Sequence, residues 1–128
     1  MKKLLTLLAT AAFAVNSYAG DFADISVPDL KKAISEKKVT IIDVNGSDAF
    51  KKAHIPTAID FDAKKADLAK SLPADKDALV VAYCGGPSCG AYQAAAKAAK
   101  DLGYKNVKHL SAGISGWQAA GEKTEAAK

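Results

Sequence analysis

The sequence predicts an α/β domain with a mostly parallel sheet and helices on both of its faces. Short apolar segments typical of strands alternate with segments of helical composition along the chain, which is the pattern of such folds. The run 78–83 is apolar throughout, as expected for a strand that helices cover on both sides. The 128 residues leave room for one domain with one modest core.

The first nineteen residues have the composition of a secretory signal peptide. Lys2 and Lys3 precede an apolar stretch at 4–15, and Ser17 and Ala19 supply small residues at a cleavage site. The apolar stretch is shorter than the roughly 20 residues that span a bilayer. We therefore expect an exported, periplasmic or secreted protein, with no stable membrane association after cleavage. We assign 1–19 to the signal peptide, 20–121 to the domain and 122–128 to a polar tail that frays.

Charge and composition exclude several classes of function. The chain has 14 acidic residues and 18 lysines, contains no arginine, and scatters its lysines singly or in pairs. A nucleic-acid surface would cluster basic residues among aromatic ones, so we expect no nucleic-acid partner. The Cys and His spacings do not form a zinc set, and no glycine-rich nucleotide motif is present. We expect neither a metal nor a cofactor.

The first elements follow from capping and β-branched residues. Ser26 can cap a helix that has Pro28 in its first turn. Residues 39–44 are predicted as a buried strand that ends in a turn. Ser47 is then expected to cap a short helix through Lys52. Further along, the same criteria predict strands at 58–61, 78–83 and 107–110 and helices at 62–71, 91–102 and 113–120.

Polar residues follow three of the predicted strands. In parallel sheets the ligand site lies outside the carboxyl ends of the strands. Asp43 and Asn45 reach that edge after one strand, Cys84 after the central strand, and Ser111 after the last one. The sequence therefore predicts a site at this edge.

The most informative stretch is 84–90, which contains both cysteines of the chain. Cys84 ends the central strand, and a loop rich in glycine separates it from a helix. Backbone N–H groups of such a loop and a helix N-terminus both stabilise a thiolate, so we predict an uncovered, nucleophilic Cys84. Ser88 adds a hydroxyl and is also a candidate for capping the following helix. The predicted substrate-binding residues are Gly85, Gly86, Ser88, Cys89 and Gly90.

Several of these residues have a structural alternative. Cys84 could be an ordinary buried cysteine followed by a turn. A disulfide with Cys89 is the default for an exported protein, but so small a loop constrains the unfolded chain little, which favours a chemical role. For His54, a hydrogen-bonding structural role is favoured over a general base. Asp43 is expected to bond nearby backbone, and His109 is expected to be structural or exposed.

Five blocks of sequence, in this order, resemble the rhodanese-like domain family: Ile41-Ile42-Asp43-Val44, residues 53–58 (AHIPTA), 80–84 (VVAYC), 102–107 (LGYKNV) and 111–117 (SAGISGW). The resemblance implies a parallel five-stranded sheet. It implies that Cys84 takes a sulfane sulfur from a donor such as thiosulfate and holds it as a persulfide for a thiophilic acceptor. It also implies structural roles for Gly116 and Trp117.

The chain departs from the family pattern at three positions. Cys89 stands where the loop usually has a basic residue, Asn45 stands where an arginine often follows the Asp-Val pair, and Thr57 replaces a usual glycine. Without arginine, bidentate recognition of an anion is lost, so we expect main-chain donors to bind the substrate, with a lysine as a further candidate. The phosphatase relatives, which depend on a loop arginine, are disfavoured.

We therefore expect an exported sulfurtransferase or persulfide carrier whose partners are a small sulfur-containing anion or a thiol acceptor. Asp43, Asn45 and His54 are the expected supporting residues. One alternative is a thiol/disulfide redox protein in which Cys89 resolves the Cys84 persulfide, with a redox partner protein to reset it. Another is a non-catalytic binding module of the same fold.

Overall fold

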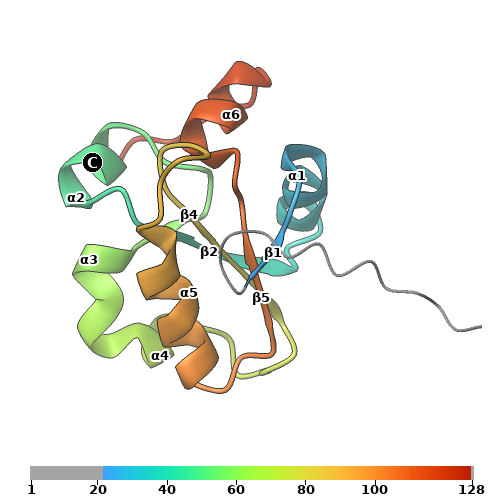
Figure 1. The fold of residues 1–128 in the computed structure, drawn as a ribbon, viewed down its shortest axis with the longest axis vertical. Helices are drawn as coiled ribbons and strands as arrows, with labels where there is room; N and C mark the ends of the chain where they lie inside the picture. Colours follow the sequence, from blue (N-terminus) through green and yellow to red (C-terminus); the bar gives the residue numbers. More distant parts are fainter. Residues whose placement is uncertain (1–21, 128) are drawn as a thin grey trace, which may run out of the picture.

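A computed structural model describes residues 22–127, so the predicted signal peptide lies outside the described residues. Five parallel strands form one sheet in the order β1-β5-β4-β2-β3 (Figure 1). The strands are β1 (Ala23–Asp24), β2 (Val39–Asp43), β3 (Ile59–Asp60), β4 (Leu79–Tyr83) and β5 (Asn106–His109). The predicted fold class is confirmed. The two-residue edge strand β1 was not among the predicted segments, because so short a strand carries no alternation pattern.

Six α-helices connect or follow the strands in the described part of the chain. They are α1 (Val27–Ser35), α2 (Ser47–Lys52), α3 (Phe61–Lys64), α4 (Leu68–Ser71), α5 (Tyr92–Asp101) and α6 (Gly113–Ala119). The single helix predicted at 62–71 is instead α3, a 3-10 turn at Lys65–Asp67, and α4, because the backbone of Asp67 leaves the helical region. Between residues 22 and 127, no helix has the length and apolar character needed to cross a bilayer.

The two predicted serine caps have different outcomes. The Ser26 hydroxyl oxygen accepts from the Asp29 N–H at 3.2 Å and caps α1 as predicted. The expectation for Ser47 is wrong, because Gly46 occupies the cap position of α2 and makes no side-chain bond there. Ser47 instead donates its hydroxyl to the Asp60 carboxylate at 2.6 Å, which ties α2 to the end of β3.

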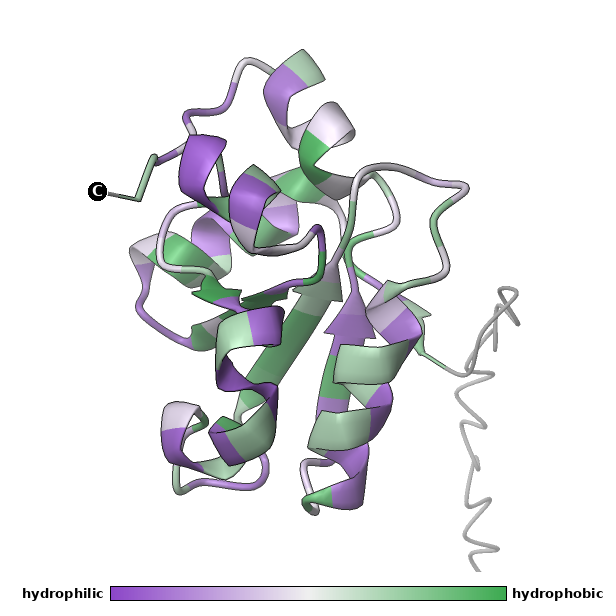
Figure 2. Cartoon of the chain, turned by 90° about the vertical axis from the view of Figure 1, so that its left-hand side faces the viewer, coloured by the Kyte–Doolittle hydropathy of each residue, from purple (hydrophilic) through white to green (hydrophobic). Residues whose placement is uncertain are grey.

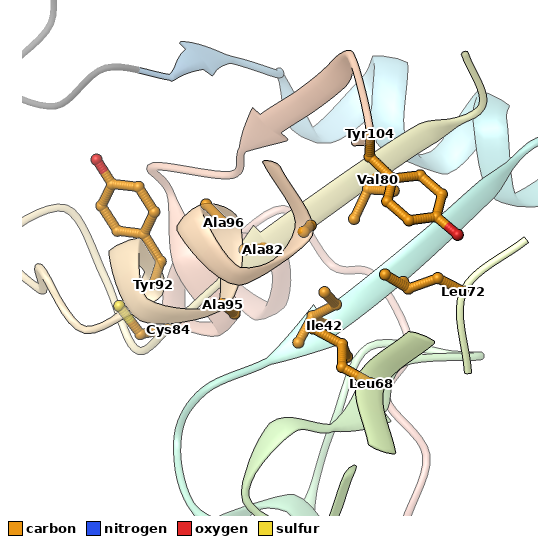
Figure 3. Packing of buried hydrophobic residues seen from close by; sticks show 11 residues of the cluster. Ile42, Leu68, Leu72, Val80, Ala82, Cys84, Tyr92, Ala95, Ala96 and Tyr104 are labelled. Atoms are coloured by element: carbon orange, nitrogen blue, oxygen red, sulfur yellow. The ribbon is translucent and has the colours of Figure 1, made fainter. Parts of the chain in front are cut away.

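The surroundings of the central strand β4 explain why its sequence is apolar without interruption. Val80 and Ala82 face one cluster, which includes α4 and α5 residues, and Val81 and Tyr83 face a second cluster with residues of α1 and α6 (Figure 3 shows the first). All four side chains are fully buried. In Figure 2 the central strands are coloured mostly as hydrophobic and lie among helices that carry both hydrophilic and hydrophobic residues. The two-sided covering predicted for this sheet is therefore present.

Strand register aligns the carboxyl ends of three strands. Asp43 pairs with Tyr83 between β2 and β4, and Ala82 pairs with His109 between β4 and β5. Cys84 follows directly on Tyr83, so it emerges between the last residues of the two flanking strands. The edge predicted for the site is thereby assembled.

The polar residues after α6 are docked rather than frayed, so that expectation is wrong. His54 and Glu125 exchange two backbone hydrogen bonds of 2.8 Å as an isolated antiparallel bridge. The Trp117 indole N–H donates to the Lys123 carbonyl at 2.8 Å, and the Ala127 N–H donates to the Lys51 carbonyl at 3.0 Å. The segment 122–127 therefore joins α6 to α2.

Candidate functional site

The loop after β4 is held in place by the start of α6. The Ile114 N–H donates to the Cys84 carbonyl at 3.0 Å, and the Ser115 N–H donates to the Gly85 carbonyl at 2.9 Å. This close approach depends on Gly113, which has a φ of +63° and whose added Cβ would lie 2.5 Å from the Gly86 nitrogen. Only glycine meets both conditions without strain. The backbone of the loop is thus positioned by a segment nearly 30 residues away.

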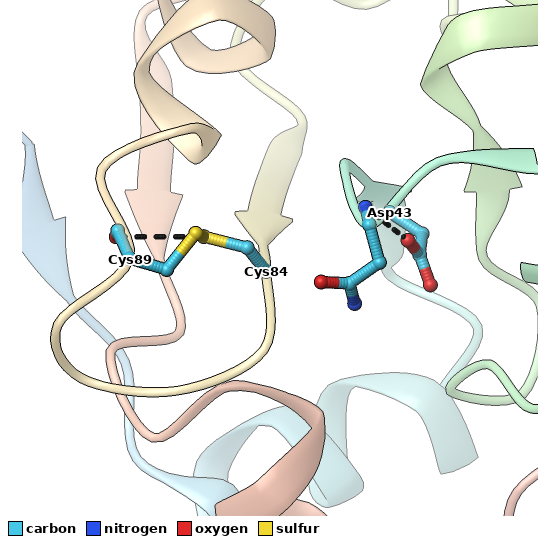
Figure 4. The surroundings of a disulfide bond; sticks show 4 residues. Asp43, Cys84 and Cys89 are labelled. Carbon is cyan, nitrogen blue, oxygen red and sulfur yellow. Dashed lines mark hydrogen bonds between the residues drawn. A yellow bond between two sulfur atoms is a disulfide. The ribbon is translucent and has the colours of Figure 1, made fainter. Parts of the chain in front are cut away.

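Cys84 and Cys89 are joined by a disulfide, with their Cα atoms 6.2 Å apart (Figure 4). The two cysteines differ in exposure: Cys84 is 1% exposed and packs beside Tyr92 and Ala95, whereas Cys89 is partly exposed. The prediction that Cys84 lies uncovered is wrong for this oxidised form. The residue belongs to the core cluster because side chains of α5 close over the strand end.

Within residues 22–127, the polar contact of the Cys84 sulfur is to a carbonyl oxygen and not to the amide donors that the sequence predicted. The Cys84 Sγ lies 3.4 Å from the Cys89 carbonyl oxygen, and a disulfide sulfur has no hydrogen to donate to it. A carbonyl oxygen carries partial negative charge, so it disfavours a thiolate at that place. The Cys89 N–H is itself engaged, since it donates to the Gly86 carbonyl at 3.2 Å. The expected cup of N–H groups around Cys84 is therefore not observed.

Ser88 does not cap the following helix. The cap position of α5 is Ala91, which has no side-chain hydrogen bond, and the helix proper begins at Tyr92. Ser88 is exposed on the outer limb of the loop. Its predicted capping role is wrong, whereas its role in substrate binding remains a prediction.

A cavity of about 390 Å³ lies between the outer limb of the loop and the ends of β1 and β5. Cys89 lines this cavity and Cys84 does not. Ser88 and Gly90 also line it, as two of the predicted binding residues, while Gly85 and Gly86 do not. The lining residues are Phe22, Asp24, Pro87, Ser88, Cys89, Gly90, Tyr92, Gln93, His109 and Ser111.

His109 lines the cavity, although the sequence predicted only a structural or exposed residue. It is 8% exposed, and the Tyr92 ring stacks on it with 3.3 Å between ring centres and 5° between planes. Within residues 22–127 its covered Nε2 atom has no hydrogen-bond partner. Burial lowers the pKa of His109, and the nearby Asp24 opposes that shift, so the ring is neutral at neutral pH. The sequence could have indicated this position, because His109 ends a predicted strand two residues before Ser111 and so lies at the same edge of the sheet.

Asp43 supports the fold rather than the cavity. It is 1% exposed and accepts hydrogen bonds from the Tyr83 hydroxyl and from the Asn45 N–H, the latter at 2.8 Å. The expected bond to nearby backbone is confirmed. Burial raises the pKa of Asp43 despite these donors, and burial with the Asp43 charge raises that of Tyr83. Figure 4 shows Asp43 at the end of the neighbouring strand, away from the disulfide.

His54 and Asn45 also lie outside the cavity lining. The His54 ring stacks on Phe50 with 3.9 Å between ring centres, and its Nδ1 is 2.8 Å from the Phe50 carbonyl oxygen. The structural role favoured for His54 is therefore confirmed. Asn45 lies beside Gly85, where its Oδ1 would be 3.7 Å from an added Cβ. The three expected supporting residues thus stand on the opposite side of the loop from the cavity.

Between residues 22 and 127, no three Cys, His, Asp or Glu side chains are grouped closely enough to hold a metal ion.

A family model described as "Rhodanese-like domain" matches residues 26–120. A search of curated proteins finds no match. The match to the family model covers most of the described chain and includes the loop, both cysteines and α6.

Three solved structures illustrate the likeness. The BH2092 protein from Bacillus halodurans is 28% identical with a TM-score of 0.66, over 82% of this chain and 77% of that chain. A thiosulfate sulfurtransferase from Pseudomonas aeruginosa is 25% identical with a TM-score of 0.69, over 83% of this chain but 20% of that one. SseA from Escherichia coli, a 3-mercaptopyruvate sulfotransferase, shares the fold at 20% identity and a TM-score of 0.66, over 82% of this chain and 50% of that chain.

Proposed function

Because the chain belongs to the rhodanese-like domain family, we propose that it is a sulfurtransferase or persulfide carrier. In this proposal Cys84 takes a sulfane sulfur from a donor such as thiosulfate and passes it to a thiophilic acceptor. The observation that carries the proposal is the position of Cys84. It directly follows the central strand, at the carboxyl edge of a parallel sheet, at the start of a loop that α6 holds in place.

The proposed transfer begins from the reduced protein. The Cys84 thiolate attacks the outer sulfur of thiosulfate, a new sulfur–sulfur bond forms on Cys84, and sulfite leaves with the electron pair of the broken bond. An acceptor thiolate then attacks the terminal sulfur of the persulfide, and the Cys84 thiolate leaves. Since Cys84 is held in a disulfide, two electrons must first open that bond.

The disulfide itself favours a second candidate, a thiol/disulfide redox protein. A Cys89 thiolate attacks the inner sulfur of the Cys84 persulfide, hydrosulfide leaves, and the Cys84–Cys89 bond forms. Both cysteines are already in bonding position in the structure. A redox partner then returns the pair to the dithiol.

Export remains part of the proposal. The composition of residues 1–19 supports a signal peptide, and a disulfide persists most readily in an oxidising compartment. Intact mass of the protein recovered from its cells tests this, because processing after Ala19 leaves Gly20 as the first residue. Retention of Met1 or its neighbours in the mature protein contradicts it.

The sulfurtransferase proposal is tested by intact-mass measurement after the reduced protein meets thiosulfate. We expect a gain of one sulfur atom in the wild type and in Cys89→Ser, and no gain in Cys84→Ser. Cys89→Ser is the matched control, because it also abolishes the disulfide but keeps the Cys84 thiol. A gain that survives Cys84→Ser, or none in any reduced form, contradicts the proposal, and the latter result favours a non-catalytic module.

The redox candidate is distinguished by the fate of the persulfide. In the wild type we expect the sulfur adduct to decay with release of sulfide and return of the disulfide. In Cys89→Ser we expect the adduct to persist until an external thiol is added. Equal sulfide release from the two proteins rules out the redox role.

A further inference from the structure

The two cysteines of the disulfide are not equally exposed. Cys84 is 1% exposed and absent from the cavity wall, whereas Cys89 is partly exposed and forms part of that wall. Thiol–disulfide exchange proceeds by attack on whichever sulfur an incoming thiolate can reach. A thiol that occupies the cavity therefore meets Cys89 and not Cys84.

The cavity wall has a distinctive charge. Asp24 is the one formally charged side chain among its lining residues, since His109 is neutral and no lysine takes part. The Asp24 Oδ1 accepts from the Ser111 N–H at 2.8 Å, which holds the carboxylate in place on the cavity wall. A wall of this kind repels a dianion such as thiosulfate and attracts a cation.

The remaining wall suits a short carbon chain. Phe22 and Tyr92 meet edge to face with 6.5 Å between ring centres, and they form an apolar side next to the Asp24 carboxylate. A volume of about 390 Å³ lies at the small end of the range for ligand pockets. The covered, unpartnered His109 Nε2 shows that polar atoms of this wall are not fully satisfied by the described protein.

We propose that this cavity binds a small aminothiol, with its ammonium group at Asp24 and its sulfur at Cys89, and that the bound thiol opens the disulfide. The site is distinct from the one at Cys84 that would receive the sulfur donor. The aminothiols that react there supply the two electrons that must reduce the disulfide before Cys84 can take up sulfur.

The reduction balances with two thiols. The first aminothiol, as thiolate, attacks the Cys89 sulfur; its sulfur bonds to Cys89, the Cys84–Cys89 bond breaks, and Cys84 leaves as a thiolate that takes up a proton. A second aminothiol thiolate attacks the sulfur of the first one. The Cys89 thiolate leaves and is protonated, and the aminothiol disulfide departs with two electrons fewer.

The inference rests on the proposed function only in its purpose, to release Cys84 for sulfur uptake. Its test contains no sulfur donor, and the sulfur-uptake test starts from protein that has already been reduced. Failure of one is therefore distinguishable from failure of the other.

The test compares the rates at which three thiols reduce the disulfide of the full protein: cysteamine, 2-mercaptoethanol and mercaptoacetate. Each rate is divided by the thiolate concentration and by the rate of the same thiolate with an open reference disulfide, because a thiolate of lower pKa is intrinsically less nucleophilic. The reaction is followed by acid quenching, alkylation and intact mass. We expect cysteamine to be fastest and mercaptoacetate slowest, with a preference of roughly five-fold over the neutral thiol, as one partly screened charge contact gives. Equal normalised rates overturn the proposal.

Asp24→Asn should remove the order among the three thiols, while its amide oxygen still accepts from Ser111. Asp101→Asn is the matched control, because it removes a carboxylate at the far end of α5 and should keep the order. An order that survives Asp24→Asn overturns the role of Asp24.

The site of attack is read on the wild-type protein, so it does not depend on any variant. Peptide mapping after partial reduction and alkylation should find the aminothiol on Cys89 and the alkyl group on Cys84. An aminothiol adduct on Cys84 contradicts the proposal.

Discussion

At the scale of single residues, a buried hydroxyl holds together the segments beneath the candidate site. The Tyr83 hydroxyl donates to the Asp43 carboxylate and accepts from the Ile55 N–H at 3.0 Å. Tyr83→Phe leaves the Ile55 N–H and the Asp43 Oδ2 atom buried without this partner, so we expect a loss of about 2–4 kcal/mol in the free energy of unfolding, measured by urea denaturation. Tyr92→Phe is the control, because its hydroxyl makes no hydrogen bond within residues 22–127. Equal losses in the two variants would show that the hydroxyl network contributes little.

The raised pKa of Asp43 predicts how stability depends on pH. Burial raises this pKa above its ordinary 3.8, so the folded protein holds the proton more tightly than the unfolded chain does. The stabilisation is complete below pH 3.8 and is lost as the pH rises through the folded-state pKa. In Asp43→Asn this loss is absent. The unfolding free energy of the wild type minus that of the variant should therefore decrease as the pH rises from 3.8 toward neutrality. A difference that is constant or grows contradicts the raised pKa.

Thr57 occupies a backbone conformation that suits glycine. Its φ is 72°, its side chain is exposed, and it stands where rhodanese-like domains usually have glycine. A β-branched residue in this region costs about 1–2 kcal/mol, which the greater freedom of unfolded glycine offsets in part. We expect Thr57→Gly to raise the free energy of unfolding by about 1 kcal/mol in thermal or urea denaturation. Thr57→Ala keeps the Cβ and should gain less; an equal gain would assign the effect to the β-branch instead.

At the scale of elements, α6 and the cysteine loop behave as one unit. A methyl group on Gly113 would lie 2.5 Å from the Gly86 nitrogen and 2.7 Å from the Cys84 carbonyl oxygen. We expect Gly113→Ala to cost at least about 2 kcal/mol of unfolding free energy and to slow re-formation of the Cys84–Cys89 bond in a thiol-quench assay. Gly90→Ala is the matched control in the same loop, because an added Cβ there meets open space. Similar behaviour of the two variants contradicts the coupling.

Most elements were predicted to within one or two residues, and the exceptions are β1 and the segment 62–71. The cap of α1, the apolar run of β4 and the body of α5 agree with the sequence to within one or two residues. β1 has two residues and gains its place by pairing with β5, which no local pattern reveals. Residues 62–71 have helical composition, yet α3 and α4 are separate because the turn at Asp67 interrupts them.

At the scale of the whole molecule, the last residues close the fold. Residues 123–127 bond to His54, Lys51 and Trp117, segments that lie on different helices or loops. We expect truncation after Glu122 to lower the free energy of unfolding by about 1–3 kcal/mol, because several hydrogen bonds are lost while chain entropy is regained. Truncation after Glu125 keeps the bridge to His54 and should cost less, as urea denaturation would show. No difference between full-length and shortened proteins would contradict this role.

The carboxyl edge of the sheet is divided by the cysteine loop into two sides with different roles. Asp43, Tyr83 and His54 lie on one side and are engaged in bonds that hold strands and tail together. Asp24, His109 and Cys89 lie on the other side, around the cavity. In our proposal the disulfide is reduced from the cavity side, before Cys84 accepts sulfur.

The sequence by itself determined the parallel α/β architecture, the position of both cysteines at one strand end, and the order of elements around them. These follow from local composition, because hydrophobic runs and caps act over a few residues. Only the tertiary structure decided that Cys84 is covered while Cys89 faces a cavity, that His109 meets Tyr92 and Asp24 there, and that the tail docks on His54. Such burial depends on how segments distant in the sequence pack against one another, and no local pattern records that.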